Sequence, residues 1–188
     1  MQLTPILKKI EHYLVSQNSI AGIRLQKGIS RAEIQQKIAH LSYSFPPEVF
    51  ELYEWKNGSV DVSDDTIGDL LLFPWGIFEP LESSLKEYDL NSKEGYWGRK
   101  HFPLFTTGGG DFLLINCDQN DASYGYIFAQ SHALYGDELI PKYKSLLTLL
   151  QCVLECYEKG AYSFVDGVLV EDRGLRNSIR KKYEIPNE

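Results

Sequence analysis

Apolar residues recur with a helical period in two places near the start of the chain. Ile6, Ile10 and Tyr13 are spaced so that one face of a helix is apolar. Further along, Ser30 and Glu33 form an S-x-x-E capping box, in which a hydroxyl and a carboxylate bond free backbone N–H groups at the start of a helix. The apolar residues after the box share one helical face and predict a second helix; they are Ile34, Ile38 and Leu41.

Two more segments carry helix signals at both ends. The stretch FPPEVFELYEWKNGS has Pro47 where a first helical turn needs no N–H group, and Gly58 where a left-handed residue ends a helix. It predicts a third, short helix between these two residues. Residues 145–159 predict a long helix that Gly160 ends. Its apolar residues line one side; they are Leu146, Leu149, Leu150, Val153, Leu154 and Tyr157.

Between the third helix and the long one, the pattern changes to short apolar or aromatic runs. Gly, Asp, Asn and Pro separate these runs, which cover residues 67–73, 102–105, 112–117 and 124–129. Runs of this kind are typical of strands in an antiparallel sheet. Near the C-terminus, YSFVDGVLV predicts a hairpin, because Asp166-Gly167 is a typical two-residue turn. We therefore expect an α+β fold with a mainly antiparallel sheet flanked by helices.

The composition agrees with a single domain over residues 1–188 and indicates the cellular compartment of the protein. A hydrophobic content of 43% excludes a disordered chain. Lys8, Lys9 and Glu11 interrupt the first apolar segment, so it lacks the core of a signal peptide, and no window has the length of a membrane span. Three cysteines cannot all pair within one chain. These observations predict a cytoplasmic protein.

The net charge of −7 narrows the choice of partner. It opposes attraction to nucleic acids and to anionic membranes, because both are bound through Lys and Arg. We expect neither as a partner, and a basic protein surface is favoured instead. The basic residues of RGLRNSIRKKYE, near the C-terminus, are interpreted as the solvated face of a helix.

The glycine run in FTTGGGDFLLIN raises the question of a phosphate-binding loop. A P-loop needs a lysine and a hydroxyl where this chain has Phe112 and Leu113, and no G-x-G-x-x-G precedes a helix. A strand follows the glycines instead. We interpret Gly108, Gly109 and Gly110, with Asp111, as a structural turn at the entry to a hairpin.

Candidate catalytic and metal-binding residues form no recognisable set. Cys152 and Cys156, four apart on a helix, place two thiols on one face, but no second Cys or His pair completes a tetrahedral zinc site. We expect both cysteines to be core residues, and we expect no metal and no cofactor. The four histidines, His101 among them, belong to no nucleophile–base signature. The chain is therefore expected to have no catalytic residue and not to be an enzyme.

The order of these segments resembles the Smi1/Knr4 (SUKH) superfamily, over roughly residues 30 to 160. A proline-led helix with a closing Asn-Gly is followed by a Phe-Pro step, a glycine-rich turn with Asp, and a Gly-hydrophobic strand. Each piece is weak alone, but the order and spacing are more specific. The matching residues are Pro47, Tyr53, Asn57, Gly58, Phe73, Pro74, Gly109, Gly110, Asp111 and Gly125 to Ile127.

The resemblance implies an α+β domain used largely for binding. Many bacterial members are immunity proteins that neutralise a toxin, often a nuclease, delivered between competing cells. A net charge of −7 suits a basic toxin domain, since acidic residues steer the encounter. Two alternatives stay open. One is a Smi1/Knr4-like regulatory interaction scaffold. The other is an enzyme on the same fold, although this sequence shows no nucleophile, metal set or cofactor motif that would serve it. The sequence leaves the oligomeric state open.

Two acidic loops are our hypothesis for the partner surface, because binding residues concentrate in the connections of a rigid scaffold. The loops are SVDVSDD, after the third helix, and DQNDASY, between two strands. Tryptophans would be the aromatic anchors of one acidic face. The full set is Asp61, Asp64, Asp65, Trp75, Trp97, Asp118 and Asp121.

Overall fold

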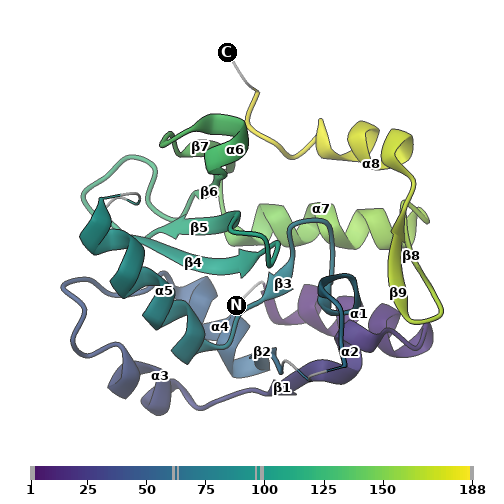
Figure 1. Cartoon of the computed structure of the whole chain (residues 1–188), viewed down its shortest axis with the longest axis horizontal. Helices are drawn as coiled ribbons and strands as arrows, with labels where there is room; N and C mark the ends of the chain where they lie inside the picture. The colour runs from purple at the N-terminus through teal and green to yellow at the C-terminus, as the bar shows by residue number, and fades with distance from the viewer. Residues whose placement is uncertain (1–2, 61, 63, 96, 98–99, 187–188) are drawn as a thin grey trace.

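The computed structural model describes residues 3–60, 62, 64–95, 97 and 100–186, arranged as in Figure 1. The helices are α1 (Leu3–Ser16), α2 (Ile20–Arg24), α3 (Arg31–Lys37), α4 (Pro47–Trp55), α5 (Leu81–Glu94), α6 (His132–Tyr135), α7 (Leu146–Glu158) and α8 (Arg173–Arg180), with a 3-10 helix, η1 (Ile67–Leu70). The strands are β1 (Leu25–Lys27), β2 (Lys56–Ser59), β3 (Ile77–Phe78), β4 (His101–Thr106), β5 (Phe112–Asn116), β6 (Ile127–Gln130), β7 (Ile140–Tyr143), β8 (Tyr162–Val165) and β9 (Val168–Glu171).

A five-stranded sheet forms the centre of the molecule. Its strand order is β3-β4-β5-β6-β7, and every neighbouring pair is antiparallel. Two smaller antiparallel ladders join β1 to β2 and β8 to β9. Helices α1, α4 and α7 pack against one another, while α5 lies along β4 (Figure 1). The expected α+β fold, an antiparallel sheet flanked by helices, is confirmed.

Aromatic side chains from the sheet and from α4 fill the core. Phe102 and Phe105 of β4 are buried, with Phe105 at a ring-centroid distance of 5.5 Å from Phe78. Tyr53 of α4 is also buried, and its hydroxyl donates a hydrogen bond of 3.3 Å to the carbonyl of Glu79. All residues of β4 after His101 are buried, so this strand is covered on both faces.

The four predicted helices and several predicted strands are confirmed with small shifts at their ends. The predicted helices are α1, α3, α4 and α7, and the confirmed strands include β4, β5 and the β8–β9 hairpin. The hydroxyl of Ser30 accepts the Glu33 N–H at 3.2 Å, as the capping box predicts, although α3 ends at Lys37, before Leu41. Asp166 and Gly167 take φ of 51° and 82° in the hairpin turn.

Two predicted strands need correction, and the prediction lacks the long helix α5 as well as the short helices α2 and α6. Residues 67–73 contain η1, which a capping box from Thr66 and Asp69 starts, and no strand. The segment 124–129 becomes extended only at Ile127, where β6 begins. The helix α5 was predictable, since Leu81, Leu85 and Tyr88 repeat at helical spacing.

Gly58 does not end α4, contrary to the prediction. The helix ends at Trp55, and Lys56 is already extended at the start of β2. Gly58 does have a positive φ, 73°, but within the strand. A Cβ on Gly58 would lie 2.2 Å from the backbone nitrogen of Pro80. Glycine is required here because the segment leading into α5 passes directly over β2.

Candidate partner-binding surface

The β8–β9 hairpin turns one apolar face toward solvent. Val165 pairs directly with Val168, and Val170 lies two residues further along β9, so these three side chains share a face. On the opposite face, Phe164 and Leu169 pack against the core. Val165 is 56% exposed and Val170 is 45% exposed. The outward face of the hairpin is therefore apolar and uncovered in the chain itself.

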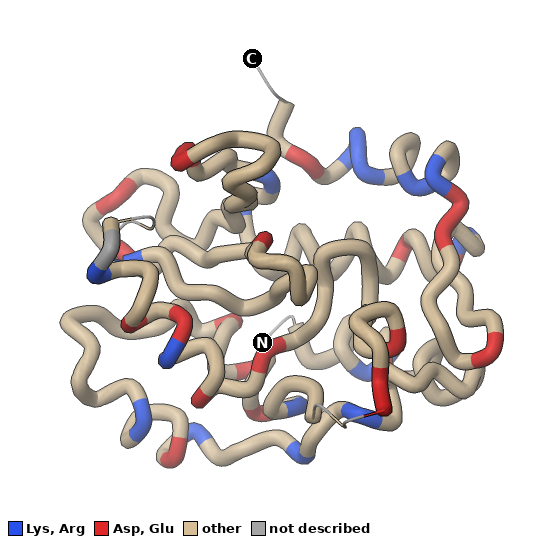
Figure 2. Tube along the Cα trace, in the orientation of Figure 1, with Lys and Arg blue, Asp and Glu red and all other residues tan. Residues whose placement is uncertain are grey.

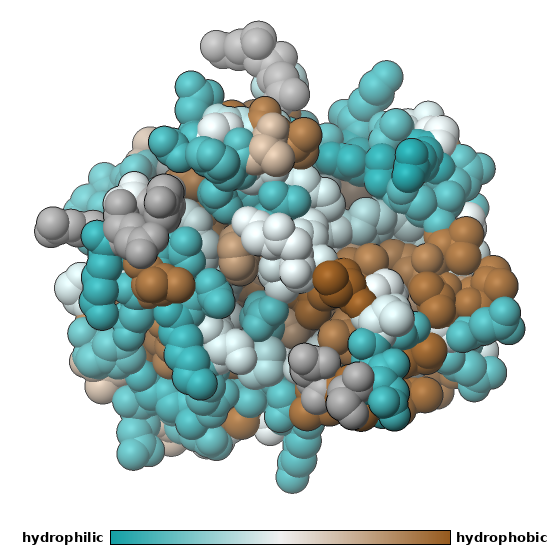
Figure 3. Space-filling model, in the orientation of Figure 1, coloured by the Kyte–Doolittle hydropathy of each residue, from teal (hydrophilic) through white to brown (hydrophobic). Residues whose placement is uncertain are grey.

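Two neighbouring elements extend this apolar face. The 3-10 helix η1 packs beside both β9 and α2, and a Cβ on Gly68 would lie 3.7 Å from Cγ1 of Val168. Ile67 of η1 is 53% exposed and Ile23 of α2 is 70% exposed. Figure 3 shows the apolar region over the hairpin and η1. We name this set the apolar patch: Ile23, Ile67, Val165, Val168 and Val170.

Carboxylates border the apolar patch. Asp64 is exposed just before η1, and Asp166 is exposed at the hairpin tip. Asp65 accepts two hydrogen bonds from Arg24, at 2.6 and 2.8 Å, and this guanidinium holds the pKa of Asp65 below its usual range. Together with Asp69 of η1, the rim contains four carboxylates and the guanidinium of Arg24, so its formal charge is negative (Figure 2). Apolar patches with a polar rim are typical of protein interaction sites.

The structure does not bring the two acidic loops together, which corrects the hypothesis of one acidic face. Asp65 lines a hollow together with Gly108, at the turn between β4 and β5. Asp118 follows the other end of β5, after Asn116. The loops therefore lie at opposite ends of the sheet. Asp61 lies outside the described residues.

Asp118 and Asp121 also hold local bonds within their own loop. Nζ of Lys100 lies 2.8 Å from Oδ1 of Asp118, and this hydrogen bond lowers the pKa of Asp118. Oδ1 of Asp121 accepts both the N–H and the hydroxyl of Ser123 at 2.7 Å. These two carboxylates order the β5–β6 connection, so a charge reversal there would also change the loop.

Neither predicted aromatic anchor belongs to the apolar patch. Trp97 is 3% exposed and packs edge-on against Phe112 at a centroid distance of 5.0 Å, so it offers a partner almost no surface. Trp75 is half-buried and lines a cavity under α8. Trp97 is therefore a core residue and not an aromatic anchor, whereas the role of Trp75 as an anchor stays a prediction.

The glycine run connects β4 to β5. The carbonyl of Asp111 accepts the Thr107 N–H at 3.0 Å, and Gly108 and Gly110 have φ of 75° and 94°. Gly109 has no positive φ. A Cβ on Gly108 would lie 3.2 Å from Ile67, so this turn packs beneath η1 and the apolar patch. The geometry is that of a hairpin turn, and the absence of a catalytic role there stays a prediction.

The candidate chemical residues occupy the interior. Cys152 and Cys156 are buried on α7, and Cys117 is a buried thiol whose pKa is raised by its burial. The ring of His101 lies edge-on to Phe128 at 5.0 Å. Within the described residues, no three His, Cys, Asp or Glu side chains are arranged to hold a metal ion. Metal-free and non-enzymatic behaviour are still predictions.

The interpretation of the basic tail as a solvated face holds for Lys181, which is exposed, but is wrong for two arginines. The side chains of Arg176 and Arg180 are 15% and 32% exposed and form ion pairs with Glu171 and Glu184. They turn toward the cavity under α8 because they are one helical turn apart on its inner side.

Sequence reasoning missed the apolar patch, although one signal for it is present. YSFVDGVLV has apolar residues at both parities of each strand, which indicates two apolar faces on a two-stranded ladder. Only one face can cover the core. The other face needs a partner or stays exposed, so apolar residues at both parities were a signal of a surface site.

The fold is an α+β domain with an exposed apolar patch and with no metal cluster among its described residues. The chain belongs to the SMI1 / KNR4 family (SUKH-1), whose profile matches residues 28–152. This confirms the resemblance, and the family is known for immunity-protein-like function. The matched range ends within α7, so β8, β9 and α8 lie beyond it. No curated protein matches the chain. No helix in the described parts is long and apolar enough to cross a membrane.

Proposed function

We propose that this protein is a cytoplasmic immunity protein that binds a basic toxin domain and neutralises it. Membership in the SMI1 / KNR4 family carries the proposal. The apolar patch supports it, because it gives the chain an exposed surface on which a protein partner can bury area. The proposed mechanism is occlusion: the bound chain covers the surface that the toxin uses on its substrate, and the chain itself performs no chemistry.

The patch and its rim have different tasks in this proposal. Ile23 and Ile67 supply affinity, since burying a large aliphatic side chain contributes about 1.5–3 kcal/mol. Asp64 and Asp166 act mainly on the association rate, because rim charges steer a basic partner over distances on the order of 10 Å in salt. A nuclease toxin suits this surface, because it presents Lys and Arg to phosphates.

The test begins with the neighbouring gene, which we expect to encode a protein that ends in a small toxin domain; that domain is the partner to be tested. Co-expression of the two in a bacterial host should restore growth, and calorimetry should detect a complex with one chain per toxin domain. The double variant Ile23→Ser/Ile67→Ser should bind at least about tenfold more weakly. The matched control is Leu90→Ser/Leu134→Ser, which removes two leucines of similar exposure, 57% and 64%, from α5 and α6.

The outcomes separate the function from the surface. Failure of the parent chain both to protect cells and to bind the toxin would reject the immunity function. Binding that the isoleucine variant keeps and the leucine variant loses would move the interface away from the apolar patch. Capture of a regulatory protein of the host, with no binding to the toxin, would favour the Smi1/Knr4-like scaffold instead.

A further inference from the structure

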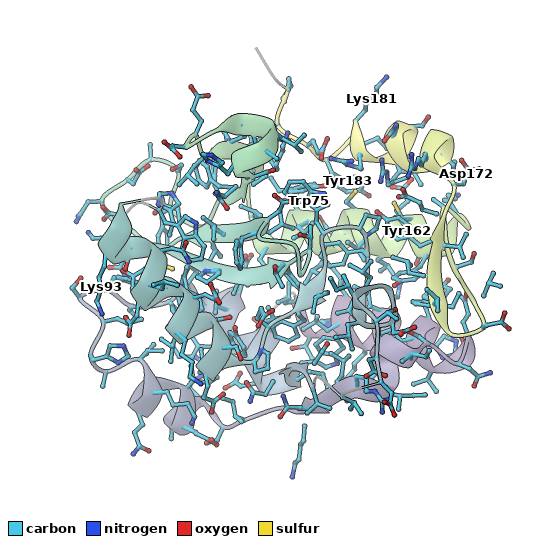
Figure 4. All side chains as sticks on the ribbon, viewed as in Figure 1. Trp75, Lys93, Tyr162, Asp172, Lys181 and Tyr183 are labelled. Carbon is cyan, nitrogen blue, oxygen red and sulfur yellow. The ribbon has the colours of Figure 1, made fainter. Side chains whose placement is uncertain are left out.

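A cavity of about 340 Å³ lies between α8 and the body of the domain. Its apolar floor comes from the sheet and from α7, and includes Leu113, Leu149 and Val153. Figure 4 shows Trp75 and Tyr162 in the space between α8 and the sheet, and both residues line the cavity. The volume is within the range of pockets that hold small organic ligands, about 300–1,000 Å³.

The lining of this cavity has the opposite charge to the chain as a whole. Four cations border it against two carboxylates, giving a formal charge of +2 in a chain of net −7. The cations are Lys142, Arg173, Arg176 and Arg180, and the carboxylates are those of Glu171 and Glu184. Both carboxylates are already paired with arginines. A guanidinium has five N–H donors, more than one carboxylate accepts, so these arginines retain donors for an anionic ligand.

Aromatic rings form the remaining walls. Tyr135, Tyr143 and Tyr162 line the cavity, and Nζ of Lys142 lies 5.4 Å from the ring centroid of Tyr135. Trp75 is held in the cavity wall with φ of 72°, in the left-handed region where a tryptophan is disfavoured. Strained residues of this kind cluster at ligand sites, where the surrounding structure maintains them.

We propose that this cavity binds a small aromatic anion. The planar body lies against Trp75 and the tyrosines, and the carboxylate or phosphate head faces Arg180 and Lys142. Arginine suits such a head group, because its planar fork matches two oxygens at once. The cations of α8 lie beyond residue 152, where the family match ends. The site therefore depends on the C-terminal segment and is separate from the proposed toxin interface.

Phenyl phosphate is the probe, with inorganic phosphate and phenol as its two halves. Calorimetry on the full chain should detect one phenyl phosphate per chain and weaker binding of either half. Lys142→Met and Arg180→Met should each weaken phenyl phosphate binding by about tenfold or more. Trp75→Gly should weaken it too, because the ring is lost while the backbone conformation remains allowed. Lys181→Met is the control, since Lys181 is exposed and points away from the cavity (Figure 4).

Thermal unfolding checks that each variant is folded. Lys142→Met keeps the test valid should Arg180→Met fail to fold, because the ammonium of Lys142 lies over the ring of Tyr135, whereas Arg180 is ion-paired with Glu184. Indole-3-acetate is a second probe, because it joins an aromatic body to a carboxylate. Absence of binding by both probes at millimolar concentration would overturn the proposal. Inorganic phosphate binding as tightly as phenyl phosphate would also overturn it, by leaving the aromatic walls without a role. Equal weakening by Lys181→Met would mean that the anion is attracted by net surface charge alone.

Discussion

At the scale of single residues, Trp75 has an unusual backbone conformation for its type. The other non-glycine residues with positive φ in the described chain are Asn18 and Asp166, whose side chains tolerate that region. Trp75 follows Pro74 in a tight turn that the Gly76 N–H closes onto the carbonyl of Phe73 at 2.7 Å. When proline is the first of the two central residues of such a turn and the second central residue has a positive φ, glycine is favoured at that second central position. The tryptophan is therefore kept at a cost to the backbone.

This strain predicts an inverted ranking of two substitutions. Both Trp75→Gly and Trp75→Ala remove the ring, so they lose the same packing, but only alanine retains a Cβ in the left-handed region. We expect Trp75→Gly to be the more stable variant by about 1 kcal/mol in the free energy of unfolding by urea. Alanine is the more stable choice at ordinary positions, so equal stability or a more stable alanine variant would contradict the strain at residue 75.

The glycine run predicts a second contrast between neighbouring residues. Gly110 has φ of 94°, and an added Cβ would have no atom within 4 Å, so Gly110→Ala should lower the free energy of unfolding by about 1 kcal/mol through backbone strain alone. Gly109 has no positive φ, and a Cβ there would meet only Oγ1 of Thr107, at 3.5 Å. Gly109→Ala should therefore be neutral or slightly stabilising in the same urea titration. A loss of toxin protection in stable variants of either residue would contradict the purely structural role of this turn.

At the scale of elements, a carboxylate of α4 joins that helix to the start of α7. Oε2 of Glu48 accepts the N–H groups of Leu146 and Leu147 at 3.1 and 3.4 Å. Burial raises the pKa of Glu48 from its ordinary value of 4.5, and the two backbone hydrogen bonds oppose this without cancelling it. A carboxyl group whose pKa is raised in the folded state stabilises the fold most when it is protonated. Its contribution to the free energy of unfolding therefore falls as pH rises from the pKa of the unfolded state toward that of the folded state.

The matched variant Glu48→Gln isolates this effect, because its amide oxygen can still accept both N–H groups but does not titrate. We expect the difference in unfolding free energy, parent minus variant, to decrease as pH rises from about 4 toward neutrality. Urea unfolding at a series of pH values measures this difference. An increase with pH would mean that attraction between the carboxylate and the N-terminus of α7 outweighs the burial of Glu48.

The elements also show how far the sequence predicts this fold. The helix α7 was predicted because its apolar residues fill one face, and β5 because FLLIN is apolar on both parities. The same reasoning failed for residues 67–73, since an apolar run that packs as η1 and a turn has the composition of a buried strand. The apolar patch and the cavity join segments far apart in the chain: η1 packs beside both α2 and β9, and Trp75 lines the same cavity as Arg180. Contacts of that kind depend on tertiary packing, which periodicity does not encode.

At the scale of the whole molecule, the net charge of −7 is divided unevenly. Carboxylates border the apolar patch, whereas the cavity under α8 is lined by an excess of cations. The two surfaces therefore attract partners of opposite charge. Asp65, Asp118 and Asp121 hold bonds within the fold, so reversing these charges would disturb the structure along with any partner contact.

Asp64 and Asp166 allow a cleaner test of steering, since both are exposed beside the apolar patch. Asparagine removes each charge at nearly constant size, and at residue 166, where φ is 51°, it tolerates the left-handed conformation as aspartate does. At low ionic strength, Asp64→Asn/Asp166→Asn should slow association with the neighbouring toxin domain by about three- to tenfold and leave the dissociation rate nearly unchanged, as stopped-flow kinetics would measure. The effect should vanish in high salt, because screening shortens the reach of rim charges.

The matched control is Asp89→Asn/Glu138→Gln, which removes the same net charge from exposed positions on α5 and after α6. This variant should associate at nearly the parent rate. Equal slowing by both double variants would show that total charge, and not the rim of the apolar patch, steers the partner.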